Sequence, residues 1–245
     1  MQLKNKIILL TGSVGTIGSE ICKKLLKNNK IISVDKKNSL IIKKNIDHYL
    51  CDFNNRDQRK IVFSKILKKY KKIDLLINCA GAISNAFYSS NIDAQYPKLW
   101  DNFIEVNLTS IFDIIIKCKS HLAKSKSPSI INIASIHADS FPNWDMYKDT
   151  KVSNLISYSV SKGGLINMTK WLATYLAPKI RVNAISPGGI KKKQDKKFLD
   201  KYIKKTPLKR MCKPSDVVNC VEFLVSEKSN YITGQNIILD GGYTL

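Results

Sequence analysis

Short apolar segments alternate with longer amphipathic segments along almost the whole chain. Six of the apolar segments are rich in Ile and Val, which is typical of strands buried on both faces. These six lie at residues 6–12, 30–35, 73–81, 129–135, 180–188 and 236–242, with a weaker seventh at 46–52. Helical patterns fill the intervals at residues 17–28, 55–70, 98–124, 154–177 and 214–226. The alternation predicts an α/β fold in which about seven parallel strands form one sheet flanked by helices on both faces.

Length and composition are those of an ordinary globular protein. The chain has 245 residues, of which 44% are hydrophobic and 24% charged, without a repeat or a break in composition. We therefore expect a single domain over residues 1–245. No apolar run approaches the ~20 residues of a membrane span, and the apolar run near the N-terminus is too short for a secretory signal, so we expect a cytoplasmic protein. The six scattered cysteines predict reduced thiols and no metal site.

The net charge of +22 is the one extreme value in the composition. A large positive charge can bind nucleic acid, a membrane surface or an acidic partner. Almost all of this charge is lysine spread along the chain, whereas forked recognition of phosphates favours arginine. We therefore expect a solvated lysine-rich surface and no nucleic-acid or membrane partner, and only the dense run at 191–197 stays open as a binding patch.

The first strand leads directly into a glycine-rich turn and a helix, in the sequence TGSVGTIGSEICKKLL. Gly12, Gly15 and Gly18 would let the backbone approach a pyrophosphate, and the first N–H groups of the helix would attract its charge. A tight strand–helix turn without a ligand is the alternative. Because strand, glycines and helix occur in this order, we expect a doubly wound, Rossmann-type sheet that binds a dinucleotide.

Two acidic residues follow the second and third strands. Asp35 ends the second strand, where a carboxylate can bond both ribose hydroxyls of NAD and would repel the 2′-phosphate of NADP. Lys36 and Lys37 follow and would instead attract that phosphate, so the residues favour NAD and leave NADP open. Asp52 is placed either to bond the adenine amino group or to cap the next helix.

A tyrosine precedes a lysine by four residues twice, in YKDTK at 147–151 and in YSVSK at 158–162. Residues four apart share one face of a helix. A tyrosine is a poor acid–base group at its ordinary pKa near ~10, whereas a nearby ammonium favours the phenolate and lowers that pKa. Either pair could also be two surface residues, so the surrounding sequence has to decide.

Seven segments in this order resemble the short-chain dehydrogenase/reductase family, specifically its short single-domain branch. They are TGSVGTIG (11–18), INCAG (77–81), VNLTS (106–110), INIAS (131–135), YSVSKGG (158–164), IRVNAISPGGI (180–190) and YITGQNIILDGG (231–242). A weaker resemblance, in the region before YSVSKGG, is to members from flagellin-modification and sugar-acid pathways. The resemblance covers essentially the whole chain and implies an NAD(P)-dependent oxidoreductase that forms a homotetramer or homodimer.

The register of these motifs favours Tyr158 over Tyr147. In the family, the Tyr–Lys helix runs on into a strand, a Val-Asn pair and a Pro-Gly turn, as this chain does from Tyr158. Tyr147 follows Ser135 by 12 residues (147 − 135), which is more usual for the family than the 23 residues to Tyr158 (158 − 135). We therefore expect an insertion around 138–157 that carries Tyr147.

By resemblance, four residues carry the catalysis. Tyr158 would exchange a proton with the substrate oxygen, and Lys162 would lower the pKa of Tyr158 and bond the nicotinamide ribose. Ser135 would hold the substrate oxygen, and Asn107 would anchor a water near Lys162. The cofactor site implied in the same way comprises Gly12, Gly15, Thr16, Ile17, Gly18, Asp35, Asp52, Phe53, Asn78, Ala80, Gly81, Tyr158, Lys162, Pro187, Gly188 and Ile190.

The chain departs from the family pattern at three positions. Thr16 stands where the short branch has its middle glycine, and Cys212 stands at a common glycine. After Pro187 the sequence GGIKKK lacks the usual threonine, so closure around the cofactor is expected to differ there.

The expected reaction is hydride transfer between a nicotinamide cofactor and a hydroxyl or carbonyl group. We expect substrate selection in the insertion and in a lysine-rich loop at 191–205, within a lid at 190–212, where the lysines would suit a sugar phosphate. One alternative is a 3-oxoacyl-carrier-protein reductase, whose acidic carrier a basic surface would attract. The other is a catalytically idle dinucleotide-binding scaffold, which would not need the intact set of four catalytic residues.

Overall fold

The structure is a computed structural model that describes residues 3–39, 41, 43–82, 97–140, 142–150 and 154–245. Within these residues, seven parallel strands form one sheet in the order β3-β2-β1-β4-β5-β6-β7. The strands are β1 (Ile7–Thr11), β2 (Lys30–Asp35), β3 (Ile46–Leu50), β4 (Leu75–Asn78), β5 (Ser129–Ile133), β6 (Arg181–Pro187) and β7 (Asn236–Leu239). The expected parallel sheet is confirmed, including the weak candidate at 46–52, which forms β3.

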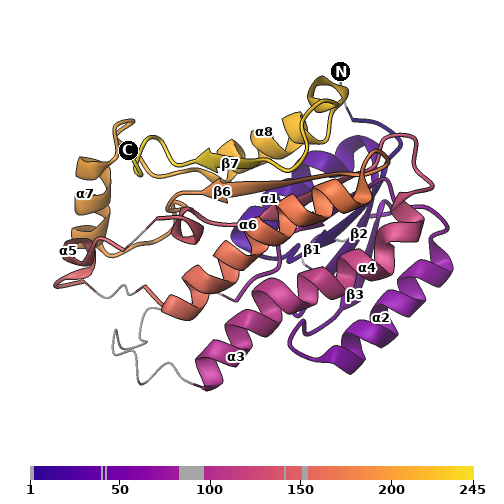
Figure 1. Cartoon of the computed structure of the whole chain (residues 1–245), viewed down its shortest axis with the longest axis horizontal. Coiled ribbons are helices and arrows are strands. Elements are labelled where there is room, and N and C mark those ends of the chain that lie inside the picture. The colour runs from indigo at the N-terminus through magenta and orange to yellow at the C-terminus, as the bar shows by residue number, and fades with distance from the viewer. Residues whose placement is uncertain (1–2, 40, 42, 83–96, 141, 151–153) are drawn as a thin grey trace.

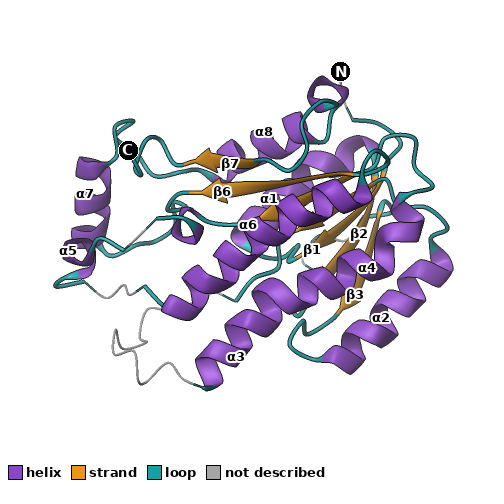
Figure 2. Cartoon of the chain, viewed as in Figure 1, coloured by secondary structure: helices purple, strands orange, loops and turns teal. Residues whose placement is uncertain are grey.

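Helices cover both faces of this sheet (Figures 1 and 2). They are α1 (Thr16–Leu25), α2 (Arg56–Lys69), α3 (Lys98–Ile104), α4 (Ser110–Leu122), α5 (Trp144–Tyr147), α6 (Ile156–Leu176), α7 (Lys196–Lys205) and α8 (Pro214–Leu224). Across the described ranges, none of the helices combines the length and apolarity that a bilayer span requires.

Two apolar cores lie on opposite faces of the sheet because alternate residues of each strand point to opposite sides. In β1, Leu9 packs into the core shared with α2, α4 and α6. Its neighbours Ile8 and Leu10 pack into the core shared with α1 and α8. All three side chains are fully buried, as expected for a central parallel strand. This arrangement leaves the carboxyl ends of the strands as the edge at which a ligand can bind.

The helix expected over 98–124 is interrupted. A π-helical turn, η3 (Glu105–Thr109), separates α3 from α4. Asn107 lies in this turn and is fully buried. Such turns widen the helix locally and occur frequently at functional sites. The interruption thus places Asn107 where a regular helix would not.

The lysine-rich segment expected as a loop at 191–205 instead contains the helix α7. This helix begins where the Asp195 side chain accepts a hydrogen bond from the Phe198 N–H at 3.1 Å. Phe198 and Tyr202 are buried on one face of the helix. The prediction was wrong because the lysines alternate with apolar residues at helical spacing, and the apolar face packs against the rest of the protein.

Part of the expected insertion packs on this helix (Figure 1). Tyr147 of α5 stacks on Phe198, with ring centroids 6.1 Å apart. The Nζ of Lys201 donates to the carbonyls of Asp145 at 2.8 Å and Lys148 at 2.7 Å, which satisfies the end of α5. Residues 141 and 151–153, which include the lysine of YKDTK, lie outside the described residues.

Candidate active site

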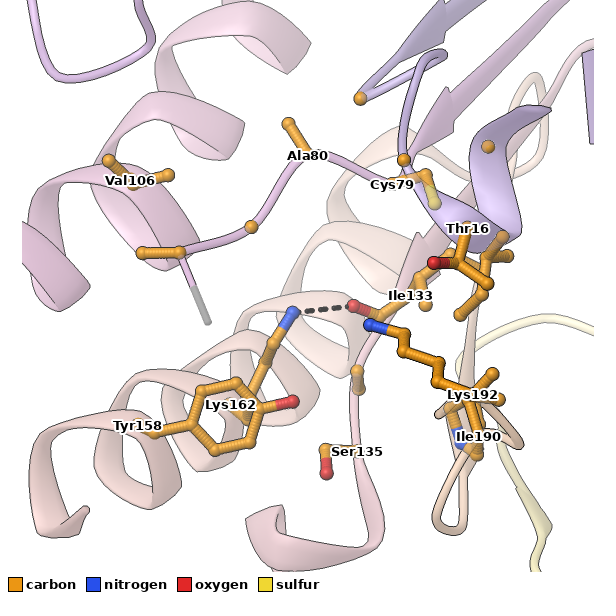
Figure 3. A pocket seen from close by; sticks show the side chains of 18 of the residues that line it. Thr16, Cys79, Ala80, Val106, Ile133, Ser135, Tyr158, Lys162, Ile190 and Lys192 are labelled. Carbon is orange, nitrogen blue, oxygen red and sulfur yellow. Dashed lines mark hydrogen bonds between the residues drawn. The ribbon is translucent and has the colours of Figure 1, made fainter. Parts of the chain in front are cut away.

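A continuous cavity of about 610 Å³ lies at the carboxyl ends of the strands (Figure 3). Its lining combines the glycine-rich turn, the ends of β2 to β6, the helix α6 and the segment after β6. Most of the expected site residues lie in this lining: Gly12, Gly15, Thr16, Ile17, Gly18, Asp35, Asp52, Phe53, Ala80, Gly81, Ser135, Tyr158, Lys162, Pro187, Gly188 and Ile190. The fold therefore brings together residues that are spread over almost the whole sequence.

The glycine-rich turn forms a close-packed cradle at one end of the cavity. Gly12 has a positive φ of 66°, and a Cβ on it would lie 2.5 Å from the Ala80 nitrogen. A Cβ on Gly18 would lie 2.0 Å from the Gly12 oxygen. Gly15 precedes α1, and the residues of its first turn line the cavity, so the N-terminus of this helix offers a positive end to an anion. These features fit the pyrophosphate of a dinucleotide.

Asp35 closes the same end of the cavity. Its side chain is almost buried, and its two oxygens accept hydrogen bonds from the backbone N–H groups of Val14 at 2.9 Å and Lys37 at 3.0 Å. These bonds tie the end of β2 to the glycine-rich turn and fix the carboxylate. Lys36 and Lys37 also line the cavity, so this end of it contains both charges that the sequence indicated.

Asp52 lies at the adenine end implied by the resemblance. Its Oδ1 accepts a hydrogen bond from the Asn54 N–H at 2.9 Å, and the residue lines the cavity. The alternative that Asp52 caps the next helix is wrong, because Asn55 caps α2 by accepting from the Gln58 N–H at 3.0 Å.

Ser135, Tyr158 and Lys162 meet at the other end of the cavity (Figure 3). The Ser135 hydroxyl oxygen accepts a hydrogen bond from the His137 N–H at 3.2 Å. The Lys162 Nζ donates to the Ile133 carbonyl at 2.7 Å and lies 5.9 Å from the centre of the Tyr158 ring. Both side chains reach the site from successive turns of α6, as the spacing predicted.

Burial dominates the protonation of this pair. It lowers the pKa of Lys162 from 10.5 to about 8, because an ammonium loses its hydration in the protein interior. It raises the pKa of Tyr158, although a hydrogen bond with Ser135 acts in the opposite direction. Desolvation of the phenolate outweighs the other effects in this structure, and the lowering of the Tyr158 pKa by Lys162 stays a prediction.

Asn107 lies behind the cavity wall. Its Oδ1 accepts from the Ala82 N–H at 2.7 Å, and its Nδ2 donates to the Ser161 hydroxyl at 3.0 Å. The Ser161 hydroxyl in turn donates to the Tyr158 carbonyl at 2.8 Å. Asn107 thus joins the end of the β4 segment to the first turns of α6.

Asn78 was expected to line the cofactor cleft, and this is wrong. Its side chain is fully buried within the sheet, and its Nδ2 donates to the Asn132 Oδ1 at 2.8 Å. The Nδ2 of Asn132 donates to the Thr169 hydroxyl at 2.9 Å. These hydrogen bonds link β4, β5 and α6, so Asn78 stabilises the packing of the strands and the helix that carry site residues.

Several cavity residues were not anticipated. They are Val14, Asn54, Cys79, Ala82, Asn102, Val106, Ile133, Ala134, Ile136, His137 and Gly189. Lys36 and Lys37 were expected beside Asp35, and the expected lid contributes Lys192, Gln194, Phe198 and Met211. The helical spacing of Phe198 and Tyr202 was the signal that could have revealed α7 as part of the wall. Tyr147 lies outside the lining, and its hydroxyl accepts a hydrogen bond from the Asn154 Nδ2 at 3.3 Å.

Comparison with known proteins gives consistent matches. A family model described as enoyl-(acyl carrier protein) reductase matches residues 29–244. Over the full length of both chains, the sequence is 32% identical to 3-oxoacyl-[acyl-carrier-protein] reductase from Thermotoga maritima and 28% identical to post-translational flagellin modification protein A from Campylobacter coli. A short chain dehydrogenase from Leptospira borgpetersenii, solved with bound NAD+, has a TM-score of 0.91 and 35% identity over 100% of this chain and 94% of that chain.

The fold and the cavity define an α/β oxidoreductase built on a Rossmann-type sheet. The chain belongs to the short-chain dehydrogenase/reductase family, which its seven motifs had indicated.

Proposed function

We propose that the protein is an NAD-dependent oxidoreductase that interconverts a hydroxyl and a carbonyl group on a small anionic substrate such as a sugar phosphate. One observation carries this proposal. A single cavity joins the glycine-rich cradle and Asp35 at one end to Ser135, Tyr158 and Lys162 at the other. A dinucleotide bound along it would bring its nicotinamide to the three side chains that can handle a proton.

The residues present fit this cofactor. Gly12, Gly15 and Gly18 would hold the pyrophosphate, Asp35 the adenosine ribose and Lys162 the nicotinamide ribose. The bound cofactor would supply or accept the hydride. Support for NAD comes from the fixed carboxylate of Asp35, which would repel a 2′-phosphate, and from the NAD+ bound in the Leptospira relative. Lys36 and Lys37 would instead attract the 2′-phosphate of NADP, so a direct test of the cofactor preference is given below.

The proton chemistry would rest on three side chains. In the direction of reduction, the Tyr158 phenol would donate its proton to the carbonyl oxygen of the substrate. The Ser135 hydroxyl accepts from the His137 N–H and forms a hydrogen bond with Tyr158. With a substrate bound, it would donate its hydrogen to the same substrate oxygen. The ammonium of Lys162 would stabilise the phenolate left behind, since opposite charges attract strongly in a buried site. Asn107 would anchor a water for returning the proton.

Anionic substrates are favoured by the lysines at the cavity mouth. Lys192 lies in the lining, and Lys191 and Lys193 flank it at the exposed surface. A second candidate function is reduction of 3-oxoacyl chains on a carrier protein, which the 32% identity to the Thermotoga maritima reductase favours. An idle scaffold is disfavoured by the three side chains gathered at one end of the cavity.

A homodimer or homotetramer is also part of the proposal. Exposed aromatic side chains on neighbouring helices support it, with Phe112 of α4 44% exposed and Trp171 of α6 58% exposed. Aromatic residues are enriched in the cores of protein interfaces.

The two Tyr-x-x-x-Lys pairs provide a matched test of the catalytic assignment. Turnover of NADH would be screened with a panel of keto-sugar phosphates and 3-oxoacyl thioesters. Tyr158→Phe should lower kcat at least 100-fold, the lower end of the usual contribution of an acid–base group, and should leave NADH binding unchanged. Tyr147→Phe, outside the cavity lining, should keep wild-type turnover. Unchanged turnover in Tyr158→Phe would refute the mechanism.

The cofactor preference can be tested by titrating NADH and NADPH into the protein and following nicotinamide fluorescence. The wild type should bind NADH more tightly. Asp35→Asn keeps an oxygen that can accept a backbone hydrogen bond but removes the negative charge, so its affinity for NADPH should rise relative to that for NADH. Tighter binding of NADPH by the wild type would contradict the NAD assignment.

A further inference from the structure

The turn that follows β6 is held in part by a tyrosine side chain from the helix α7. Its backbone N–H groups donate to three acceptors: Gly188 to the Leu239 carbonyl at 2.9 Å, Lys191 to the Cys212 carbonyl at 2.8 Å, and Gly189 to the Tyr202 hydroxyl at 2.7 Å. The first two acceptors are backbone groups. Tyr202 is the side-chain acceptor of the three, and it comes from α7, thirteen residues along the chain from Gly189.

The Tyr202 ring also lies directly on the two glycines of this turn. A Cβ on Gly189 would lie 3.0 Å from the ring atoms Cε2 and Cζ of Tyr202, and a Cβ on Gly188 would lie 2.7 Å from its hydroxyl oxygen. Any larger residue in the turn would therefore displace the ring. The Tyr202 ring can pack against the turn because neither glycine has a side chain.

A second aromatic ring also packs on the Tyr202 ring. The Tyr243 ring stacks on it, with centroids 4.5 Å apart and an angle of 10° between the planes. The Nζ of Lys205 lies 4.2 Å from the centre of the Tyr243 ring, in a cation–π arrangement. Tyr202 is only 4% exposed. Because the ring is buried and stacked on Tyr243, its hydroxyl group is held in its bond to Gly189.

The turn itself is a wall of the cavity, whereas Tyr202 lies behind it. Pro187, Gly188, Gly189 and Ile190 line the cavity, and Ile190 and Lys192 are seen beside Ile133 in Figure 3. This is also the segment in which the sequence lacks the threonine usual for the family. The Tyr202 hydroxyl bonds to the backbone of the turn, so its loss would reach a bound ligand first through that backbone.

We propose that Tyr202 is a positioning residue, which holds the Gly188–Gly189 backbone as the wall at the nicotinamide end of the cavity and thereby ties α7 to the site. The proposal rests on the proposed function, because it assumes a nicotinamide dinucleotide in this cavity. The opposite end of the cavity, with the glycine-rich cradle and Asp35, is built by β1, α1 and β2, and among the described residues it forms no hydrogen bond with Tyr202. The hydroxyl of Tyr202 should therefore matter for the nicotinamide half of the cofactor and not for the adenosine half.

ADP-ribose separates the two halves, because it carries the adenosine, pyrophosphate and ribose of NADH without the nicotinamide. Tyr202→Phe removes only the hydroxyl group and keeps the stacked ring. Tyr243→Phe is the matched control, since it removes the hydroxyl of the ring stacked on Tyr202 without touching the bond to Gly189. Dissociation constants of NADH and ADP-ribose would be measured by calorimetry for the wild type and both variants.

Loss of the one hydrogen bond should weaken NADH binding by Tyr202→Phe roughly 3- to 10-fold. ADP-ribose should bind this variant as it binds the wild type, and Tyr243→Phe should match the wild type for both ligands. Equal weakening of both ligands, or no weakening of NADH, would overturn the positioning role while leaving the proposed function intact. A wild type that binds neither ligand would overturn the proposed function and this inference with it.

Discussion

Replacing Lys162 with methionine should make the cofactor-free protein more stable at neutral pH. The Lys162 side chain is only 5% exposed, and its Nζ has the Ile133 carbonyl as hydrogen-bond acceptor at 2.7 Å. Burial lowers its pKa from 10.5 to about 8. Since one pKa unit corresponds to about 1.4 kcal/mol, keeping this amine charged costs the folded state about 3 kcal/mol. Methionine avoids that cost but loses the hydrogen bond, which contributes about 1.5 kcal/mol, so the net gain should be about 1–2 kcal/mol.

The stability that Lys162→Met gains over the wild type should disappear as the pH rises. Below pH 8 the amine is charged in both folded and unfolded chains, and the whole cost is present in the wild type. Between pH 8 and 10.5 the unfolded chain still binds the proton that the folded chain has released, so the free energy of unfolding of the wild type increases with pH. Burial raises the pKa of the neighbouring Cys79 thiol to about 12, so this thiol stays protonated in the folded state over the same pH range. Other titrating groups are common to both proteins and cancel in the difference.

Urea denaturation of the wild type and Lys162→Met would be compared at several pH values from about 7 to about 10.5. Lys170→Met is the matched control, because Lys170 lies on the same helix but is exposed, and it should stay within about 0.5 kcal/mol of the wild type at every pH. The reasoning is refuted if Lys162→Met is less stable than the wild type at pH 7. It is equally refuted if the difference between the two proteins does not change across this pH range.

Three further substitutions test the residues that support the site. Arg59 is 2% exposed at its side chain and binds Glu105 at 2.7 Å, so Arg59→Met should lower the free energy of unfolding by about 3 kcal/mol in urea denaturation. Arg56→Met, which removes a 74% exposed partner of the same Glu105, should cost less than about 1 kcal/mol, and equal losses would contradict the role of burial. Gly18→Ala places a Cβ 2.0 Å from the Gly12 oxygen and should abolish NADH binding in a fluorescence titration; wild-type affinity would show that the cradle is not the dinucleotide site.

Local patterns predicted most of the fold. The five inner strands β1, β2, β4, β5 and β6 coincide with apolar segments, because strands buried on both faces must be apolar at nearly every position. The pattern of α7 was just as local, with Phe198 and Tyr202 four apart, but its many lysines obscured it. The π-helical turn at Glu105–Thr109 could not be predicted, since its residues continue the helical pattern on both sides and the widening follows from how Asn107 is bonded to Ala82 and Ser161.

The sequence by itself determined the strands, the glycine-rich turn and the helical spacing of Tyr158 and Lys162, because each depends on residues that are close together in the chain. Only the tertiary structure decided that Tyr202 supports Gly189 and that Asn78 bonds to Asn132 inside the sheet. It also decided that burial raises the pKa of Tyr158 and lowers that of Lys162. Desolvation and long-range hydrogen bonds depend on segments that meet only when the whole sheet has formed, and no spacing along the chain records them.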